Sequence, residues 1–231
     1  MTRPGTGRAI LPTVTGAVLF DFDYTLGESE DGIVLCANHA LAAMGLPPAP
    51  RQAIRRTIGL TLEAMYERLT GRDGDEAAAF REAFIACADR HMTRHTTLYR
   101  GVPELLETLH GQGFALGVVT TKRSHRVREV LERHGLERFV AITVGIDSVP
   151  RPKPAPDGIR LAMTRLGADP SGTLFVGDSV VDGEAAARAG VPFAAVLTGA
   201  TSRAELERWR PVAVLRNVTA VPPLLGALRR D

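Results

Sequence analysis

Residues 17–25, Ala17-Val18-Leu19-Phe20-Asp21-Phe22-Asp23-Tyr24-Thr25, carry the chain from four apolar residues into two carboxylates, an aromatic ring and a hydroxyl. Such a short apolar run predicts a fully buried strand, here over residues 17–23. Side chains alternate along a strand, so Asp21 and Asp23 leave it on the same side. Ligands of an open parallel sheet bind beyond the carboxyl ends of its strands, so this strand ends where chemistry is expected. Two bare carboxylates ~4 Å apart repel by roughly 4 kcal/mol at an effective dielectric near 20, and a divalent cation or a shared proton offsets this repulsion.

The composition is that of an ordinary globular protein. The chain has 231 residues, 45% of them hydrophobic and 23% charged, which fits one large domain or a core with a smaller inserted domain. A net charge of +2 without a dense basic run gives no electrostatic support for a nucleic-acid partner. No apolar run approaches the ~20 residues that span a bilayer, and Pro12 interrupts any targeting segment. We therefore expect a cytoplasmic protein with no membrane partner, and the sequence leaves its oligomeric state open.

Residues 31–98 form a helical block with no convincing strand. Apolar residues recur at helical spacing from Ile33 to Met44, from Leu62 to Leu69, and at Phe80, Phe84 and Cys87. Before this block, residues 1–15 resemble a loose tail and residues 27–32 a loop. The two cysteines, Cys36 and Cys87, lack metal-ligand spacing, so we expect reduced, buried thiols.

After Tyr99, short apolar strands alternate with helices. The predicted strands cover residues 115–119, 139–146, 173–176, 193–197 and 212–215. The predicted helices start near Pro103, start after an N-cap at Ser124, and cover residues 154–166, 182–189, 202–209 and 220–229. Alternation of this kind predicts a parallel α/β sheet that includes the strand at 17–23. The predicted fold is a Rossmann-like parallel sheet flanked by helices, formed by residues 1–30 and 99–231, with an inserted α-helical domain at 31–98.

Polar residues gather where the predicted strands end. Asp21 and Asp23, Thr120 and Thr121, and Asp178 and Ser179 each follow a strand, while Arg151-Pro152-Lys153-Pro154 opens a helix. In a parallel sheet these clusters converge on one edge. Acids suit a hard cation such as Mg²⁺, whereas a lysine and a hydroxyl bind phosphate oxygens. A carboxylate can then attack phosphorus and form an aspartyl-phosphate.

This arrangement resembles the haloacid dehalogenase-like (HAD) hydrolase superfamily over nearly the whole chain. Four parts occur in the order of that family: the DxDxT pattern Asp21-Phe22-Asp23-Tyr24-Thr25, Thr120 at a strand end, Lys153 within Lys153-Pro154-Ala155-Pro156-Asp157, and Gly177-Asp178-Ser179-Val180-Val181-Asp182. The helical insertion looks like the α-helical cap of the family. The overall layout is most similar to phosphoglycolate phosphatases.

The resemblance implies a Mg²⁺-dependent phosphatase that hydrolyses a small phosphorylated metabolite, phosphoglycolate or a similar ester. Asp21 would be the nucleophile, and Asp23 the acid and base. Thr120 and Lys153 would bind the phosphoryl group, with Thr121 beside them. The metal ligands would be Asp21, the backbone carbonyl of Asp23, Asp178 and Asp182, the last directly or through a water. Physical chemistry agrees with this division, because one carboxylate must be ionised and the other protonated at the same pH.

Several alternatives stay open at this point. A sugar phosphomutase of the β-phosphoglucomutase type shares the same four motifs, and a non-catalytic phosphate-binding regulatory protein shares the fold. Sugar phosphates, nucleotide monophosphates and pyrophosphate are rival substrates. The second acid, Asp23, argues against dehalogenation, and the lack of lysine in residues 31–98 argues against a Schiff-base carbon–phosphorus hydrolase.

Some residues have two interpretations. Tyr24 stands where the family usually has glycine and could line the site or contact the cap, and Thr121 stands where close relatives often have asparagine. Lys122, one of only two lysines, is either a surface residue or faces phosphate. Asp182 could simply be a helix N-terminal acid. Four further residues are expected to be ordinary ones: His91 and His95 on a solvated helix face, and Arg55 and Arg56 as surface cations near the expected substrate loop Ile58-Gly59-Leu60.

Overall fold

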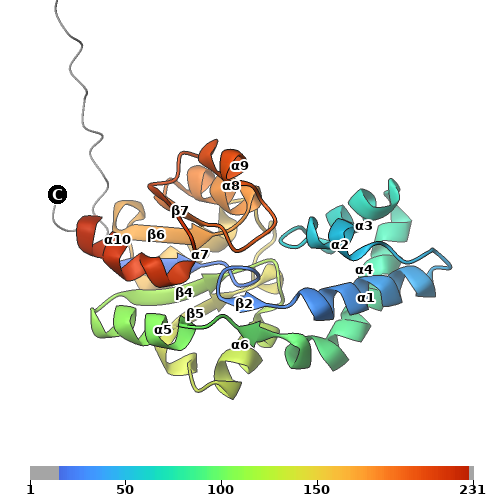
Figure 1. The fold of residues 1–231 in the computed structure, drawn as a ribbon, viewed down its shortest axis with the longest axis horizontal. Helices are drawn as coiled ribbons and strands as arrows, with labels where there is room; N and C mark the ends of the chain where they lie inside the picture. Colours follow the sequence, from blue (N-terminus) through green and yellow to red (C-terminus); the bar gives the residue numbers. More distant parts are fainter. Residues whose placement is uncertain (1–15, 229–231) are drawn as a thin grey trace, which may run out of the picture.

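The computed structural model describes residues 16–228, in which a six-stranded parallel sheet forms the core. The strand order is β5-β4-β1-β6-β7-β8 (Figure 1). The strands are β1 (Ala17–Phe20), β4 (Ala115–Val119), β5 (Ile142–Val144), β6 (Thr173–Gly177), β7 (Phe193–Val196) and β8 (Ala213–Leu215). β1 lies between β4 and β6, in parallel register with both. A strand covered on both faces has to be apolar throughout, which explains the run at its centre.

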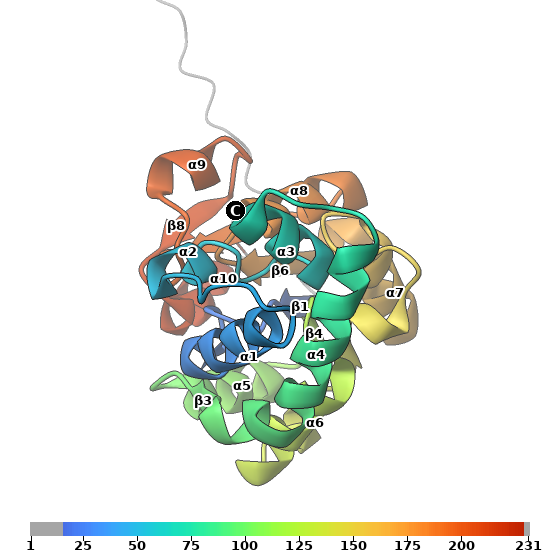
Figure 2. The same ribbon diagram turned by 90° about the vertical axis from the view of Figure 1, so that its right-hand side faces the viewer.

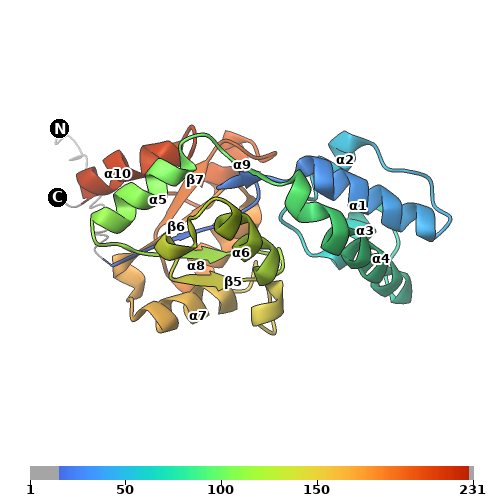
Figure 3. The same cartoon turned by 90° about the horizontal axis from the view of Figure 1, so that it is seen from below.

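Helices cover both faces of this sheet (Figures 1 and 3). Val18 and Phe20 point to the face packed by α5, α6 and α10, whereas Leu19 points to the face packed by α7, α8 and α9. The helices are α5 (Val102–Gly111), α6 (Ser124–Arg133), α7 (Asp157–Leu166), α8 (Val180–Ala189), α9 (Arg203–Glu207) and α10 (Val221–Leu228). Short 3₁₀ helices connect them: η2 (Glu137–Phe139), η3 (Ile146–Ser148), η4 (Pro170–Gly172) and η5 (Val218–Ala220). The prediction of a parallel sheet flanked by helices is confirmed.

Several predicted boundaries were wrong for local reasons. The strand expected at 139–146 is only three residues long, because 3₁₀ helices adjoin both of its ends. Ser124 is the first residue of α6 rather than its N-cap. α7 begins at Asp157, after Pro154 and Pro156, and the Lys153–Pro154 peptide bond is cis. α8 begins at Val180, two residues before the predicted start, because Ser179 forms a capping box with Asp182.

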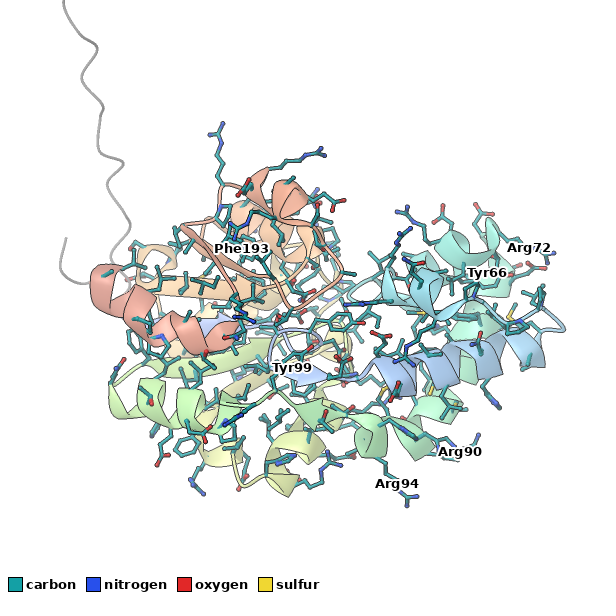
Figure 4. All side chains as sticks on the ribbon, in the orientation of Figure 1. Tyr66, Arg72, Arg90, Arg94, Tyr99 and Phe193 are labelled. Atoms are coloured by element: carbon teal, nitrogen blue, oxygen red, sulfur yellow. The ribbon has the colours of Figure 1, made fainter. Side chains whose placement is uncertain are left out.

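The inserted helices pack around an apolar cluster of their own. This helical unit contains α1 (Glu30–Ala43), α2 (Arg51–Arg55), α3 (Leu62–Thr70), α4 (Asp75–His91) and the 3₁₀ helix η1 (Met92–His95). Its cluster includes Ile33, Leu41, Met65, Tyr66 and Phe80. In Figure 1 the unit lies beside the sheet, and in Figure 2 it stands in front of it. Tyr66 lies toward the far end of the unit from the core (Figure 4).

The prediction of residues 27–32 as a loop, followed by a block without strands, was wrong. β2 (Gly27–Glu28) and β3 (Thr97–Leu98) form a two-stranded antiparallel sheet where the chain leaves the core and returns to it. Helix α2 was not predicted, because five residues are too few to show a helical period. The domain boundaries at residues 31 and 98 stay a prediction, and the expected tail at 1–15 lies outside the described residues.

Two further expectations concern the cysteines and the membrane. Cys36 and Cys87 are buried free thiols, as predicted. Within residues 16–228, none of the helices is both long enough and apolar enough to span a bilayer.

Candidate active site

The carboxyl ends of β1, β4 and β6 bring three of the predicted clusters to one edge of the sheet. The backbone N–H of Asp21 donates to the carbonyl of Val176 at 2.8 Å, and that of Thr120 donates to the carbonyl of Val144 at 2.9 Å. Both residues therefore extend the ladder of hydrogen bonds by one position beyond their strands. Asp178 follows β6 directly. We call Asp21, Lys153, Asp178 and Asp182 the sheet-edge group.

Lys153 places a buried cation inside this group. Its Nζ lies 2.8 Å from Asp21 Oδ1 and 2.6 Å from Asp182 Oδ1, and its side chain is only 2% exposed. Burial alone would lower the pKa of the Lys153 ammonium, but the charges of Asp182 and Asp21 outweigh it and raise the pKa above its ordinary value. Lys153 is therefore charged, and the predicted proximity of Asp21, Lys153 and Asp178 is present in the fold.

Asp182 uses both of its carboxylate oxygens within the protein. Oδ1 accepts from Lys153, and Oδ2 accepts from the backbone N–H groups of Asp178 and Ser179 and from the Ser179 hydroxyl. A Cβ at Gly177 would come within 2.5 Å of Asp182 Cγ, so the glycine leaves room for this carboxylate. Both interpretations of Asp182 thus apply: it caps α8, and it belongs to the acidic group.

The donor set fits a hard divalent cation. Asp21, Asp178 and Asp182 each offer one carboxylate oxygen, and these oxygens lie within 4.8 Å of one another. Burial, followed by repulsion from Asp182 and Asp21, raises the pKa of Asp178. Burial raises the pKa of Asp21 to about 7, although Lys153 opposes this. One ammonium faces three acids, so a bound cation would balance the remaining charge and favour their ionised forms.

Two further residues shape the environment of Asp178, and sequence analysis gave neither of them a role there. The Thr25 hydroxyl donates to Asp178 Oδ1 at 3.3 Å. A Cβ at Gly199 would lie 1.8 Å from Asp178 Oδ2, so the loop after β7 passes directly against the carboxylate. Thr198, its neighbour, donates its hydroxyl to the carbonyl of Tyr24. Only the folded arrangement of this distant loop shows these contacts.

Asp23 lies apart from the three carboxylates and pairs with Lys122. The distance from Lys122 Nζ to Asp23 Oδ2 is 3.1 Å, and both side chains are buried. Asp23 Oδ1 is buried without a hydrogen-bond partner among residues 16–228. Lys122 is therefore not a surface residue. The predicted metal contact of Asp23 is its backbone carbonyl, and this stays a prediction.

The two threonines after β4 have different surroundings. The Thr120 hydroxyl is buried and accepts from the backbone N–H of Lys122 at 3.1 Å, which leaves its own hydrogen available to a ligand. The Thr121 hydroxyl donates to the carbonyl of Gly59 in the helical unit at 3.2 Å. Thr121 therefore joins the core to the helical unit, and its predicted contact with phosphate stays a prediction.

Tyr24 joins the same two parts of the molecule. Its backbone has a φ of 59°, which is uncommon for any residue but glycine. Its hydroxyl donates to Glu30 Oε2 at 2.5 Å, and the Arg55 guanidinium lies 5.7 Å from the ring centroid. Arg51 Nε donates to the other oxygen of Glu30 at 2.5 Å. Of the two roles considered for Tyr24, the structure shows the contact with the helical unit.

A cavity of about 240 Å³ lies between the helical unit and the core. From the core it is lined by Asp23, Thr121 and Lys122, and from the helical unit by residues that include Gly59 and Phe84. Its volume is below the range of roughly 300–1,000 Å³ that is usual for drug-sized ligands. His91 and His95 are not among its lining residues. The cavity therefore offers a small organic group access to Asp23.

Comparisons with known proteins identify the family of this chain. The family model described as haloacid dehalogenase-like hydrolase matches residues 18–196. An N-acetylmuramic acid 6-phosphate phosphatase of Pseudomonas aeruginosa is 35% identical over 185 residues, covering 79% of this chain and 82% of its own. A phosphoglycolate phosphatase of Pseudomonas putida is 30% identical over 218 residues, covering 91% and 80%.

The solved structures agree as well. A crystal structure of a haloacid dehalogenase-like hydrolase from Bacteroides fragilis superposes with a TM-score of 0.86 at 36% identity, covering 89% of this chain and 98% of its own. The resemblance carried by the four motifs is thereby confirmed.

Proposed function

The chain belongs to the haloacid dehalogenase-like hydrolase family, and from this premise we propose that it is a Mg²⁺-dependent phosphatase that acts on a small phosphomonoester through an aspartyl-phosphate. Its relatives are phosphatases that act on small phosphate substrates. One observation carries the proposal: the ammonium of Lys153 lies buried between Asp21 and Asp182, at a sheet edge where three carboxylates come within 4.8 Å.

In the first half of the reaction Asp21 is the nucleophile. A carboxylate oxygen of Asp21 forms a bond to phosphorus as the bond from phosphorus to the ester oxygen breaks. Asp23 gives its proton to the departing oxygen, which leaves as an alcohol. Lys153 and the Thr120 hydroxyl bind the oxygens of the phosphoryl group, where their positive charge and free hydrogen stabilise the charge in the transition state.

In the second half a water molecule attacks the aspartyl-phosphate. Asp23, now ionised, accepts a proton from that water as the new bond to phosphorus forms. The bond between phosphorus and Asp21 breaks, inorganic phosphate leaves, and both carboxylates return to their starting states. The pairing of Asp23 with Lys122 at 3.1 Å holds the acid in place on the cavity side of the group.

The predicted metal would be held by Asp21 and Asp178 together with the Asp23 carbonyl. Asp182 would act on the metal indirectly or through a water, because its oxygens already accept hydrogen bonds from Lys153 and Ser179. When bound, Mg²⁺ would polarise a phosphoryl oxygen and offset charge in the transition state. Thr25 and Gly199 then act by fixing the position of Asp178.

The helical unit is the cap in this proposal. Its contacts with the core at Tyr24 and Thr121 cover the side of the site that holds Asp23. Such a cover would exclude water until the leaving alcohol departs. The size of the cavity supports a small substrate, with phosphoglycolate-like esters as first choice and pyrophosphate or sugar phosphates as rivals.

The test is phosphate release from a panel of phosphoglycolate, a hexose phosphate, a nucleoside monophosphate and pyrophosphate. We expect Mg²⁺-dependent release by the natural protein and only background release by Asp21→Asn. The matched control Asp73→Asn, which changes an exposed acid in the helical unit, should behave as the natural protein does.

Three results would contradict parts of the proposal. Near-normal release by D21N refutes the nucleophile. Release that survives exhaustive chelation refutes the metal. Isomerisation of a sugar bisphosphate without net phosphate release identifies a phosphomutase instead.

A further inference from the structure

Arg126 is a buried guanidinium in the same cavity as Asp23. It lies in the first turn of α6 with a side chain only 6% exposed. Its Nη2 donates to Asp89 Oδ1 at 2.6 Å and to the carbonyl of Ile85 at 3.4 Å. Its Nε is buried with no acceptor in the described part of the chain. A buried donor without an acceptor is rare, because it loses its hydrogen bonds to water and gains none in the protein. A ligand in the cavity could supply the missing acceptor for this N–H.

Arg126 is a buried cation of the cavity whose carboxylate partner lies outside the lining. Four cationic side chains and three carboxylates line the cavity: Arg81, Lys122, Arg123, Arg126, Asp23, Glu63 and Asp147. Arg81 pairs with Glu63 at 3.3 Å, and Lys122 Nζ lies 3.1 Å from Asp23 Oδ2, so the carboxyl partner of each of these two cations lies inside the cavity. The partner of Arg126, Asp89, is half exposed and is not a lining residue. An anion in the cavity would therefore meet an excess of positive charge.

The cavity also has an apolar lining. Ile58, Leu60, Met65, Phe84 and Met92 of the helical unit line the cavity. An apolar wall beside one or two directed polar groups is the usual design of a small-molecule site. This wall suits a hydrocarbon body, whereas Arg126 suits an anionic end.

We propose that Arg126 binds a carboxylate on the leaving group, so that the preferred substrate is a phosphomonoester whose alcohol combines an apolar body with a carboxylate. This rests on the proposed function, in which Asp23, a lining residue of the same cavity, protonates the leaving oxygen. The phosphoryl group lies at Lys153 and the carboxylate at Arg126. A guanidinium binds a carboxylate through directed, charge-assisted hydrogen bonds, which a neutral sugar or a bare pyrophosphate would not offer.

The experiment compares two esters of equal chain length, 4-phosphooxybutanoate and butyl phosphate. We expect the natural protein to favour the carboxylated ester in kcat/KM by about ten- to a hundredfold, the worth of a hydrogen bond to a charged group. Arg126→Met should lose most of this ratio. Arg126→Lys, which keeps the charge but not the planar fork, should retain part of it. Asp89→Asn serves as the control, because it removes the ion pair with the helical unit but leaves Arg126 in place.

Three outcomes overturn the inference. One is a natural protein that hydrolyses both esters equally well. Another is an unchanged ratio in R126M. The third is a D89N variant that loses the ratio as fully as R126M, since Arg126 would then act only by joining α6 to α4. Failure of the proposed function looks different, because the natural protein would then release phosphate from neither ester.

Discussion

The sheet-edge group and the cavity beside it both contain ion pairs of acidic and basic side chains, but these pairs differ in how far they are buried. At the sheet edge, Lys153 and Asp182 are 2% and 0% exposed, and the neighbouring Ser179 hydroxyl donates to a carboxylate oxygen of Asp182. In the cavity, Arg81 and Glu63 are about half exposed and come from two helices of the inserted unit. Buried ion pairs with short distances hold one geometry, whereas half-exposed ion pairs can rearrange around different ligands.

In the proposed function, this contrast places the chemistry at the sheet edge and the selectivity in the cavity, whose lining comes from both the core and the helical unit. The parallel sheet aligns the ends of β1, β4 and β6, and this alignment is independent of what the helices carry. In that proposal the cavity holds the organic part of the substrate. Substitutions at the sheet edge should therefore change stability and turnover strongly, and substitutions between the two units should act more weakly.

The largest effect is expected at Lys153. Lys153→Met leaves Asp21 and Asp182 buried without their shared cation. Breaking a buried pair in this way costs about 3–5 kcal/mol in the free energy of unfolding. Chemical denaturation measures this loss, and phosphate release should fall to background in the same variant.

Lys122→Met is the control for that substitution. Lys122 is also buried, but in the described residues it pairs with one carboxylate, Asp23, at the longer distance of 3.1 Å. We expect a smaller loss of unfolding free energy than for K153M. Equal losses in the two variants would show that the sheet edge is no more demanding than the cavity, and the contrast would fail.

The second effect concerns the loop that passes over Asp178. Gly199→Ala places a Cβ 1.8 Å from Asp178 Oδ2, so the carboxylate or the loop has to move. Overpacking of this kind costs about 1–3 kcal/mol, and activity should require a higher Mg²⁺ concentration. Gly111→Ala is the matched control, because its Cβ meets nothing within 4 Å. A Mg²⁺ requirement in G199A equal to that in G111A would argue against Asp178 as a ligand.

The sheet edge could be predicted from sequence because its determinants are local. A buried apolar run, alternation along the strand and a parallel sheet suffice to bring Asp21 and Asp178 together. Lys153 was recognisable because lysine is otherwise almost absent from this arginine-rich chain. The boundaries of short elements such as α2 and the β2–β3 pair were missed, since a few residues carry no measurable period.

Residues 58–60, the expected substrate loop, do line the cavity, but the rest of its lining could not be predicted, because those residues are far apart in the chain. Arg126 pairs with Asp89, 37 positions earlier, and nothing in the sequence near either residue marks the pair. The direction of Lys122 depends on the turn after β4 rather than on the alternation within it. Gly199 looks like any loop glycine until the fold places Asp178 against it. Tertiary packing alone decides these positions.

The third prediction uses pH to separate function from stability at the sheet edge. The pKa of Asp21 in the folded protein, about 7, lies above the ordinary 3.8, chiefly because the carboxyl is buried. The folded state therefore keeps a proton that the unfolded chain has released. The resulting stability is full below the ordinary pKa and is lost as the pH rises through about 7.

Asp21→Asn has no such proton to lose. In metal-free buffer we expect it to melt at a higher temperature than the natural protein at pH 8, with the gap closing toward pH 4. Each kcal/mol corresponds to about 2–4 °C for a chain of this size. Added Mg²⁺ should stabilise the natural protein more than D21N. A gap that is constant with pH would mean that Asp21 is already ionised in the metal-free fold.

The smallest effect is expected where the two regions meet, at Tyr24. Tyr24→Phe removes the hydrogen bond to Glu30 but keeps the ring beside Arg55. The loss should be about 1 kcal/mol of stability and about a two- to tenfold fall in kcat/KM, the worth of one ordinary hydrogen bond. Tyr66→Phe is a close match, because the Tyr66 hydroxyl also donates to a glutamate, Glu76, at 2.7 Å. Tyr66 lies toward the far end of the helical unit (Figure 4), so Y66F should lose similar stability and keep full kcat/KM. If Y24F also keeps full kcat/KM, the hydrogen bond between Tyr24 and Glu30 of α1 only stabilises the fold, and substrate selection in the cavity does not depend on it.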